Sequence, residues 1–193
     1  MKEKSIFKMV LSSYGNMLLA GVLCLIVSIS IAVFQLPMIV IELITLVLIV
    51  PLYIALLYSP IWTEGDRNRN MVQFGHLVWD KYKGLKIGLF LMIPYFIENV
   101  FLTLSWAKVI PDIFWIYKIL NSHLWPIMTW LNPIQEGNWI SINNMSVLSL
   151  IICWIFMFYP LIISVIAYFL GYKGISVSEK LIYKNKPRKK RHY

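Results

Sequence analysis

Apolar residues are grouped along the chain in four long runs that more polar segments separate. The four runs are residues 17–34, 38–58, 87–106 and 147–170. About 20 helical residues cross a bilayer core of about 30 Å, so each run is long enough to span it. None shows the alternation of apolar and polar residues over about ten positions that a strand of a membrane barrel requires. The pattern therefore predicts an all-α, polytopic membrane protein with four transmembrane helices.

The connections between the runs differ in length and in polarity. Only Gln35, Leu36 and Pro37 separate the first two runs, so we expect these helices to form a tight antiparallel hairpin. The third and fourth runs are joined by residues 107–146 and form a second hairpin. Residues 171–193 follow the last run as a basic tail.

The connection inside the second hairpin contains a stretch, Ile110–Leu131, that is apolar enough to suggest a fifth span. Lys118, Asn121 and His123 argue against a span, because polar side chains are costly in hydrocarbon. The tryptophans of this stretch suit the headgroup level, where amphipathic rings accumulate. We therefore expect an interfacial or re-entrant helical segment on the outer face of the membrane.

Residues 59–86, between the second and third runs, carry an amphipathic pattern. Polar side chains recur at steps of four and three, and apolar side chains form the opposing stripe. The polar stripe consists of Arg69, Gln73, His76, Asp80 and Lys83, and the apolar stripe of Met71, Phe74, Val78 and Tyr82. This pattern predicts a helix that lies on the membrane surface from Arg69 to Lys83. A similar pattern in residues 1–15 predicts another interfacial helix ahead of the first span.

The distribution of Lys and Arg predicts the orientation in the membrane. Of the 18 Lys and Arg residues, all but Lys108 and Lys118 lie in residues 1–15, 59–86 or 171–193. Basic residues accumulate on the cytoplasmic side of membrane proteins. We therefore expect both termini and the 59–86 connection to be cytoplasmic, in a multi-pass protein of the cell membrane.

The composition explains what must cover this protein and which partners it favours. Hydrophobic residues make up 59% of the chain and charged residues 14%, against about 25% charged in a soluble domain, so lipid must cover the excess. The net charge of +9 comes from residues beside the spans, which makes nucleic acid an unlikely partner and favours anionic lipid at the cytoplasmic face. The expected lipid contacts are Arg67, Arg69, Lys81, Lys83, Lys86, Arg188, Lys189, Lys190 and Arg191.

Two carboxylates lie inside predicted spans and form the candidate intramembrane site. Glu98, followed by Asn99, is about halfway along the third span, and Glu42 is about five residues inside the outer end of the second. A carboxylate at the bilayer centre costs several kcal/mol unless it is protonated or paired. Glu98 with Asn99 is therefore either a proton or ion site or a hydrogen-bonded residue of helix packing or subunit docking. The packing interpretation is favoured, because no Lys, Arg or His lies in these runs to pair with it.

Motifs for catalysis, metals or cofactors are not found. Asp66, Asn68 and Asn70 have the spacing that begins a calcium loop, but the positions that require Gly and Glu are Met71 and Leu77. The chain contains no nucleophile elbow, phosphate loop or HExxH motif. We therefore predict no catalytic residue, no metal ligand and no cofactor.

The sequence favours a non-enzymatic accessory, scaffold or lipid-interacting component of a membrane assembly. Such a component would contact other membrane subunits or a second copy of itself. The alternative is a small oligomeric transporter or channel subunit that uses Glu98 as an intramembrane ion or proton site. The richness in Lys, Ile and Asn indicates a bacterial protein.

Overall fold

The computed structural model describes residues 5–34, 36–132, 141–142 and 145–176, and in these residues it contains helices and no strand. Each predicted run lies largely within a helix or a broken helix long enough to cross a membrane. These are α1 (Ile6–Ala32), α2 (Met38–Gln73), α3 (Lys83–Trp106) and the pair α6 (Val147–Phe156) and α7 (Tyr159–Tyr172). The prediction of an all-α, polytopic membrane protein is confirmed.

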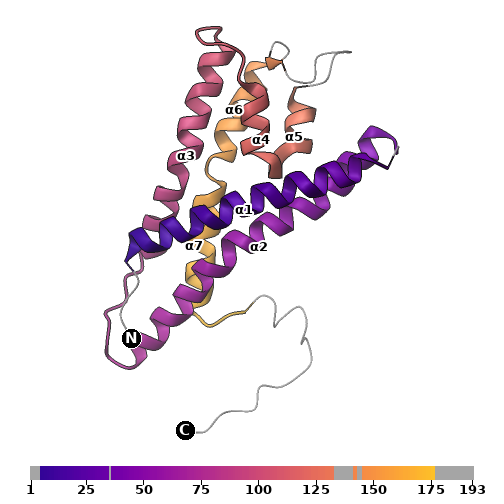
Figure 1. The fold of residues 1–193 in the computed structure, drawn as a ribbon. Coiled ribbons are helices and arrows are strands. Elements are labelled where there is room, and N and C mark those ends of the chain that lie inside the picture. The colour runs from indigo at the N-terminus through magenta and orange to yellow at the C-terminus, as the bar shows by residue number, and fades with distance from the viewer. Residues whose placement is uncertain (1–4, 35, 133–140, 143–144, 177–193) are drawn as a thin grey trace.

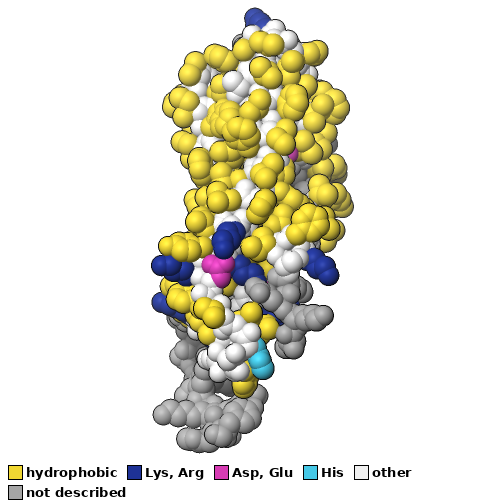
Figure 2. All heavy atoms as spheres, turned by 90° about the vertical axis from the view of Figure 1, so that its left-hand side faces the viewer, with side chains coloured by type: hydrophobic (Ala, Val, Ile, Leu, Met, Phe, Trp, Pro, Cys, Tyr) yellow, Lys and Arg dark blue, Asp and Glu magenta, His cyan; other side chains and the backbone are white. Residues whose placement is uncertain are grey.

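The two hairpins cross each other in the structure. The α1–α2 hairpin runs obliquely across α3 and the α6–α7 pair, as Figure 1 shows. Basic side chains gather toward one end of the molecule, and the surface between them and the other end is largely apolar (Figure 2). We call the end that carries Arg67, Arg69, Lys81 and Lys86 the basic end, and the other the opposite end.

Close backbone contact between α2 and α7 forms the main junction of the two hairpins. A Cβ on Gly65 would lie 2.3 Å from the carbonyl oxygen of Tyr168, and a Cβ on Gly171 would lie 2.1 Å from that of Trp62. Small residues let helix backbones approach closely in membranes, where packing drives helix association. Glycine is therefore required at both positions of this crossing.

Helix α1 is held by carbonyl oxygens that prolines have left without an intrahelical donor. Pro94 has no N–H for the oxygen of Phe90, which lies four residues earlier, and the Tyr14 hydroxyl of α1 donates to that oxygen. In the same way Pro60 frees the oxygen of Leu56, and Asn16 Nδ2 of α1 donates to it at 3.4 Å. Proline positions in α2 and α3 thus help to determine where α1 packs.

Proline also breaks the last span. Pro160 stands in the first turn of α7, where it cannot continue the hydrogen bonding of α6, and residues Met157 and Phe158 form a turn between the helices. The break lies along the predicted 147–170 span. Tyr159 is the first residue after the break.

Two of the predicted surface elements are corrected by the structure. The predicted helix from Arg69 to Lys83 is wrong, because α2 ends at Gln73 and residues 74–82 are not helical. Gly75, which has a φ of 72°, terminates the helix. His76 N–H donates to the oxygen of Met71 at 2.9 Å, which closes a Schellman cap. In residues 6–15 the predicted interfacial helix is the first part of α1 and no separate element.

Candidate intramembrane binding site

Between α3 and α6 the chain forms a re-entrant helical hairpin. Helix α4 (Phe114–Leu120) runs into the bundle from the opposite end, the 3-10 turn η1 (Ser122–Leu124) forms the tip, and α5 (Trp125–Leu131) runs back (Figure 1). Ser122 Oγ donates to the oxygen of Gly21 in α1 at 2.8 Å and anchors the tip. The segment therefore forms a helical hairpin that enters and leaves the helix bundle at the same end.

The tip of the hairpin supplies a polar partner for Glu98. Asn121 Nδ2 donates to Glu98 Oε2 at 2.8 Å and to the oxygen of Tyr117 at 3.1 Å. Glu98 is half-buried, whereas Asn121 is almost completely buried. A buried polar group is costly unless it is hydrogen-bonded, so each side chain reduces the cost of placing the other inside the bundle.

Glu98 also lines a cavity of about 220 Å³ between α1 and α3. Tyr14, Tyr53 and Tyr95 line it together with Glu98, and the remaining lining is apolar. The hydroxyl groups of Tyr53 and Tyr95 are hydrogen-bonded to each other. The cavity is therefore lined by one carboxylate, three tyrosines and apolar side chains.

His123 stacks on Tyr53 and also lies beside Tyr159, and the three rings form a cluster. Its ring centroid is 3.8 Å from that of Tyr53, with an interplanar angle of 13°, and 5.7 Å from that of Tyr159, at 20°. The side chain is 1% exposed, and neither ring nitrogen has a hydrogen-bond partner among the described residues. A buried imidazole without a hydrogen-bond partner is unusual, because nearly all buried polar groups in proteins are hydrogen-bonded.

Asn99, which the sequence pairs with Glu98, lies on a different face of α3 and does not line the cavity. Consecutive helical residues are about 100° apart around the axis, so neighbours in sequence point apart. Asn99 Oδ1 accepts from the Tyr117 hydroxyl at 3.2 Å, and its Nδ2 donates to the oxygen of Tyr95 at 2.8 Å. The geometry makes Asn99 a contact that ties α4 to α3.

Glu42 belongs to a separate cavity of about 400 Å³ between the α1–α2 hairpin and the re-entrant hairpin. Lys118 lines the same cavity, is 4% exposed, and lies with its Nζ 5.4 Å from the ring centroid of Trp125. The Nε1 of Trp130 donates a hydrogen bond to Glu42. The structure therefore does not bring Glu42 and Glu98 into one site.

At the basic end, the structure corrects one of the expected lipid contacts. Lys83 is 1% exposed, and its Nζ lies 3.1 Å from Glu64 Oε1. The Asn68 amide completes the cluster, with its oxygen 3.0 Å from Lys83 Nζ and 3.0 Å from the Tyr168 hydroxyl when its nitrogen faces Glu64. Lys83 is therefore a buried residue that joins α2 to α3, because a carboxylate 19 residues earlier pairs with it.

Other expected lipid contacts also have carboxylate neighbours. Arg67 lies 3.5 Å from Glu64, and Arg69 lies 2.7 Å from Asp66. Lys86 lies 2.7 Å from Asp80. The expected contacts in the tail, Arg188, Lys189, Lys190 and Arg191, lie outside the described residues.

The pKa of Asp80 lies below its ordinary value, mainly because Lys86 Nζ donates a hydrogen bond to it. The N–H of Tyr82 donates a second one, at 2.9 Å. Both bonds favour the charged carboxylate and order the turn that precedes α3.

Sequence reasoning missed the residues that pair with the two carboxylates. Asn121, the partner of Glu98, and Trp130, the partner of Glu42, both belong to the re-entrant hairpin. In the sequence Asn121 argues against a span and Trp130 suits the headgroup level, so neither indicates a partner for a carboxylate. The available signal was the presence of polar side chains in an otherwise apolar stretch, which is also what a segment buried in protein at membrane depth contains.

The fold and this site define a class, a polytopic helical membrane protein whose bundle contains an inserted helical hairpin and a cavity lined by one carboxylate. Among the described residues, no group of three His, Cys, Asp or Glu side chains could hold a metal ion. Comparison with known protein families, curated proteins and solved structures found no match.

Proposed function

We propose that this multi-pass membrane protein is a small transporter or channel subunit that binds a proton or small cation at Glu98. The observation that carries the proposal is the hydrogen bond from Asn121, at the tip of a re-entrant hairpin, to Glu98 at a cavity. A carboxylate attracts a cation by its charge, and Glu98 is the carboxylate that lines this cavity. The proposed role is non-enzymatic.

Interruptions of helical backbone inside the bundle support a transport role. The tip between α4 and α5 is one interruption, and the break between α6 and α7 is another. Tyr159 follows that break and stacks on His123 of the tip, so the two interruptions meet. Transporters place binding sites at discontinuous helices, because irregular backbone is tolerated in the membrane only where protein or a polar cavity surrounds it.

Flux in proteoliposomes tests the proposal. The purified full-length chain would be reconstituted with a pH-sensitive dye inside, and cation-driven proton movement would be measured against protein-free vesicles. We expect Glu98→Gln to abolish the flux, because glutamine keeps the shape of the side chain and removes its charge. Glu42→Gln, in the other cavity, is the matched control and should retain most of the flux.

Two results would contradict the proposal. Flux that is unchanged in Glu98→Gln, or no flux above protein-free vesicles across the alkali cations and small organic ammonium ions, removes the transport role. Asn121→Ala should reduce the flux without abolishing it, because it takes away the partner of Glu98 but leaves the carboxylate.

A second candidate function, as an accessory component of a larger membrane assembly, is favoured by the far part of the α1–α2 hairpin. Ile29, Val33, Ile39 and Leu43 are exposed there, and in Figure 1 this part extends away from the other helices. Lipid or another subunit must cover it. Co-purification of the intact tagged chain from native membranes discriminates: a stoichiometric larger partner supports an accessory role, and a homodimer supports the oligomeric transporter.

The proposed orientation places the basic end in the cytoplasm of a cell membrane. Its support is the positive-inside bias together with the Lys and Arg side chains that gather toward that end (Figure 2). A cysteine introduced at Lys81 should be protected from an impermeant maleimide in intact cells, whereas one at Lys108 should be labelled. The reverse pattern would invert the orientation. The native Cys24 and Cys153 are buried and give little background.

A further inference from the structure

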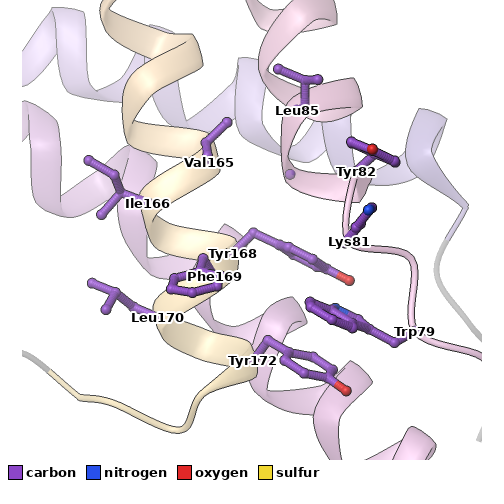
Figure 3. Close-up of a pocket in the computed structure, with 11 residues that line it drawn as sticks. Trp79, Lys81, Tyr82, Leu85, Val165, Ile166, Tyr168, Phe169, Leu170 and Tyr172 are labelled. Carbon is purple, nitrogen blue, oxygen red and sulfur yellow. The ribbon is translucent and has the colours of Figure 1, made fainter.

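A groove at the basic end lies between the start of α3 and the end of α7. Its volume is about 340 Å³. Figure 3 shows the side chain of Trp79 above that of Tyr172, with Lys81 farther up beside Tyr82. The ring centroids of Trp79 and Tyr172 are 4.6 Å apart at an interplanar angle of 13°. The groove is therefore bordered by aromatic rings on the side nearer to the basic end.

The lining becomes aliphatic toward the middle of the molecule. Leu85 follows Lys81 into α3, and Val165 and Ile166 precede Tyr172 on α7, so all three lie deeper along the spans (Figure 3). Aromatic and basic side chains at the rim with aliphatic ones beyond them match the order of headgroup and acyl chain in one leaflet. From its rim inward the groove thus changes from aromatic and basic side chains to aliphatic ones, in the same order as the headgroup and acyl chain of a lipid.

Lys81 and Lys173 lie beside aromatic rings that line this groove. Lys81 lines the groove and its Nζ lies 4.9 Å from the ring centroid of Tyr82, while Lys173 Nζ lies 4.3 Å from that of Phe169, which also lines it. Both lysines are exposed. Within the described part of the chain neither forms an ion pair, in contrast to Arg67, Arg69, Lys83 and Lys86.

We propose that the groove binds one anionic phospholipid of the adjacent leaflet. Its acyl chain lies along Leu85, Val165 and Ile166, and its phosphate lies at the rim with Lys81 and Lys173. Charge complementarity selects this occupant, because two cations that form no ion pair with any described residue favour an anion, and the net positive charge of segment 177–193 disfavours that segment. A groove of this volume is within the range of small-molecule sites. The site is independent of Glu98.

Lipid retention measured by native mass spectrometry tests the proposal. The full-length protein in detergent would be titrated with phosphatidylglycerol and, separately, with phosphatidylcholine of the same chains. Wild type should retain phosphatidylglycerol preferentially, and Lys81→Gln/Lys173→Gln should weaken that retention about 25-fold, at about fivefold per lysine. Phosphatidylcholine binding should change little.

Three controls distinguish the site from general attraction. Lys86→Gln removes a charge at the same end that Asp80 already pairs, and should leave retention within about twofold. Lys108→Gln, on the connection at the opposite end, should have no effect. Val165→Trp should fill the deep part of the groove and reduce binding of both lipids while leaving the lysines in place.

Particular results would overturn the proposal. Equal retention of the two lipids by wild type, or an unchanged preference in Lys81→Gln/Lys173→Gln, refutes the headgroup contact. An equal loss in Lys86→Gln refutes a localised site in favour of diffuse attraction. Displacement of the lipid by inorganic phosphate at millimolar concentration would mean that the rim holds an anion without its acyl chain, which also contradicts the assignment.

Discussion

Replacement of Tyr14 by phenylalanine tests how α1 is fixed against the rest of the bundle. The change removes one hydroxyl group and keeps the ring, so the apolar contacts of the side chain remain. The hydroxyl donates to the oxygen of Phe90, which has no intrahelical donor because residue 94 is proline. Tyr14→Phe therefore leaves that oxygen without its partner from α1.

The expected cost follows from what such bonds contribute in membranes. Interhelical hydrogen bonds contribute about 0.6 kcal/mol on average and about 1.7 kcal/mol at most. The oxygen of Phe90 has no intrahelical N–H donor. The cost of Tyr14→Phe should therefore lie in the upper half of this range, at about 1 to 1.5 kcal/mol. In a Pro94→Ala background, Ala restores an N–H to that oxygen. The cost of Tyr14→Phe should then fall to about 0.5 kcal/mol, a measurable coupling between the two positions.

Unfolding of the purified protein in mixed micelles by increasing SDS, followed by tryptophan fluorescence, measures these differences. Tyr58→Phe is the matched control, because the Tyr58 hydroxyl is buried and has no hydrogen-bond partner among the described residues. Its removal should be neutral or stabilising. If Tyr14→Phe costs no more than Tyr58→Phe, or costs the same with proline and alanine at position 94, the freed carbonyl does not fix α1.

Two further predictions concern the junction of the hairpins. Gly171→Ala should destabilise the protein by about 1–3 kcal/mol in the same assay, because its Cβ would meet the Trp62 carbonyl oxygen at 2.1 Å. Gly15→Ala, with nothing within 4 Å of the new Cβ, should instead stabilise by up to about 1 kcal/mol, and equal effects would refute the close crossing. Lys83→Met should cost about 3 kcal/mol by leaving Glu64 buried without this partner, and adding Glu64→Leu should recover most of it; no recovery would contradict the buried pair.

The four spans could be predicted because a membrane span requires about 20 apolar residues in a row, and such a run can be recognised from consecutive residues alone. The end of α2 could not be predicted in this way. Its apolar run stops at Tyr58, but the helix continues to Gln73, since apolarity marks the part inside lipid and not the end of the helix. Gly75 was the local signal for that end.

The candidate site was only half predictable, because burial of a polar group depends on residues far away in the sequence. Glu98 was identified as unusual from its position in an apolar run, but its partner Asn121 lies 23 residues later. Lys83 at the edge of a span resembles a lipid contact until Glu64 is known to lie against it. In each case the pattern locates the polar residue, and only the packing of the helices shows what pairs with it.

Both carboxylates accept a hydrogen bond from the re-entrant hairpin, although they line separate cavities. Glu98 accepts from Asn121 at its tip, and Glu42 accepts from Trp130 on α5. A charged carboxylate needs such donors more than a neutral one, because burial opposes the charge and hydrogen bonds favour it. Under the proposed function, a proton on Glu98 therefore weakens one of the bonds that hold the tip, while the bond from Ser122 to Gly21 is unaffected. Glu98→Gln removes the charge and keeps the hairpin in place. It therefore tests the carboxylate by itself, whereas deletion of the hairpin would remove the surrounding structure as well.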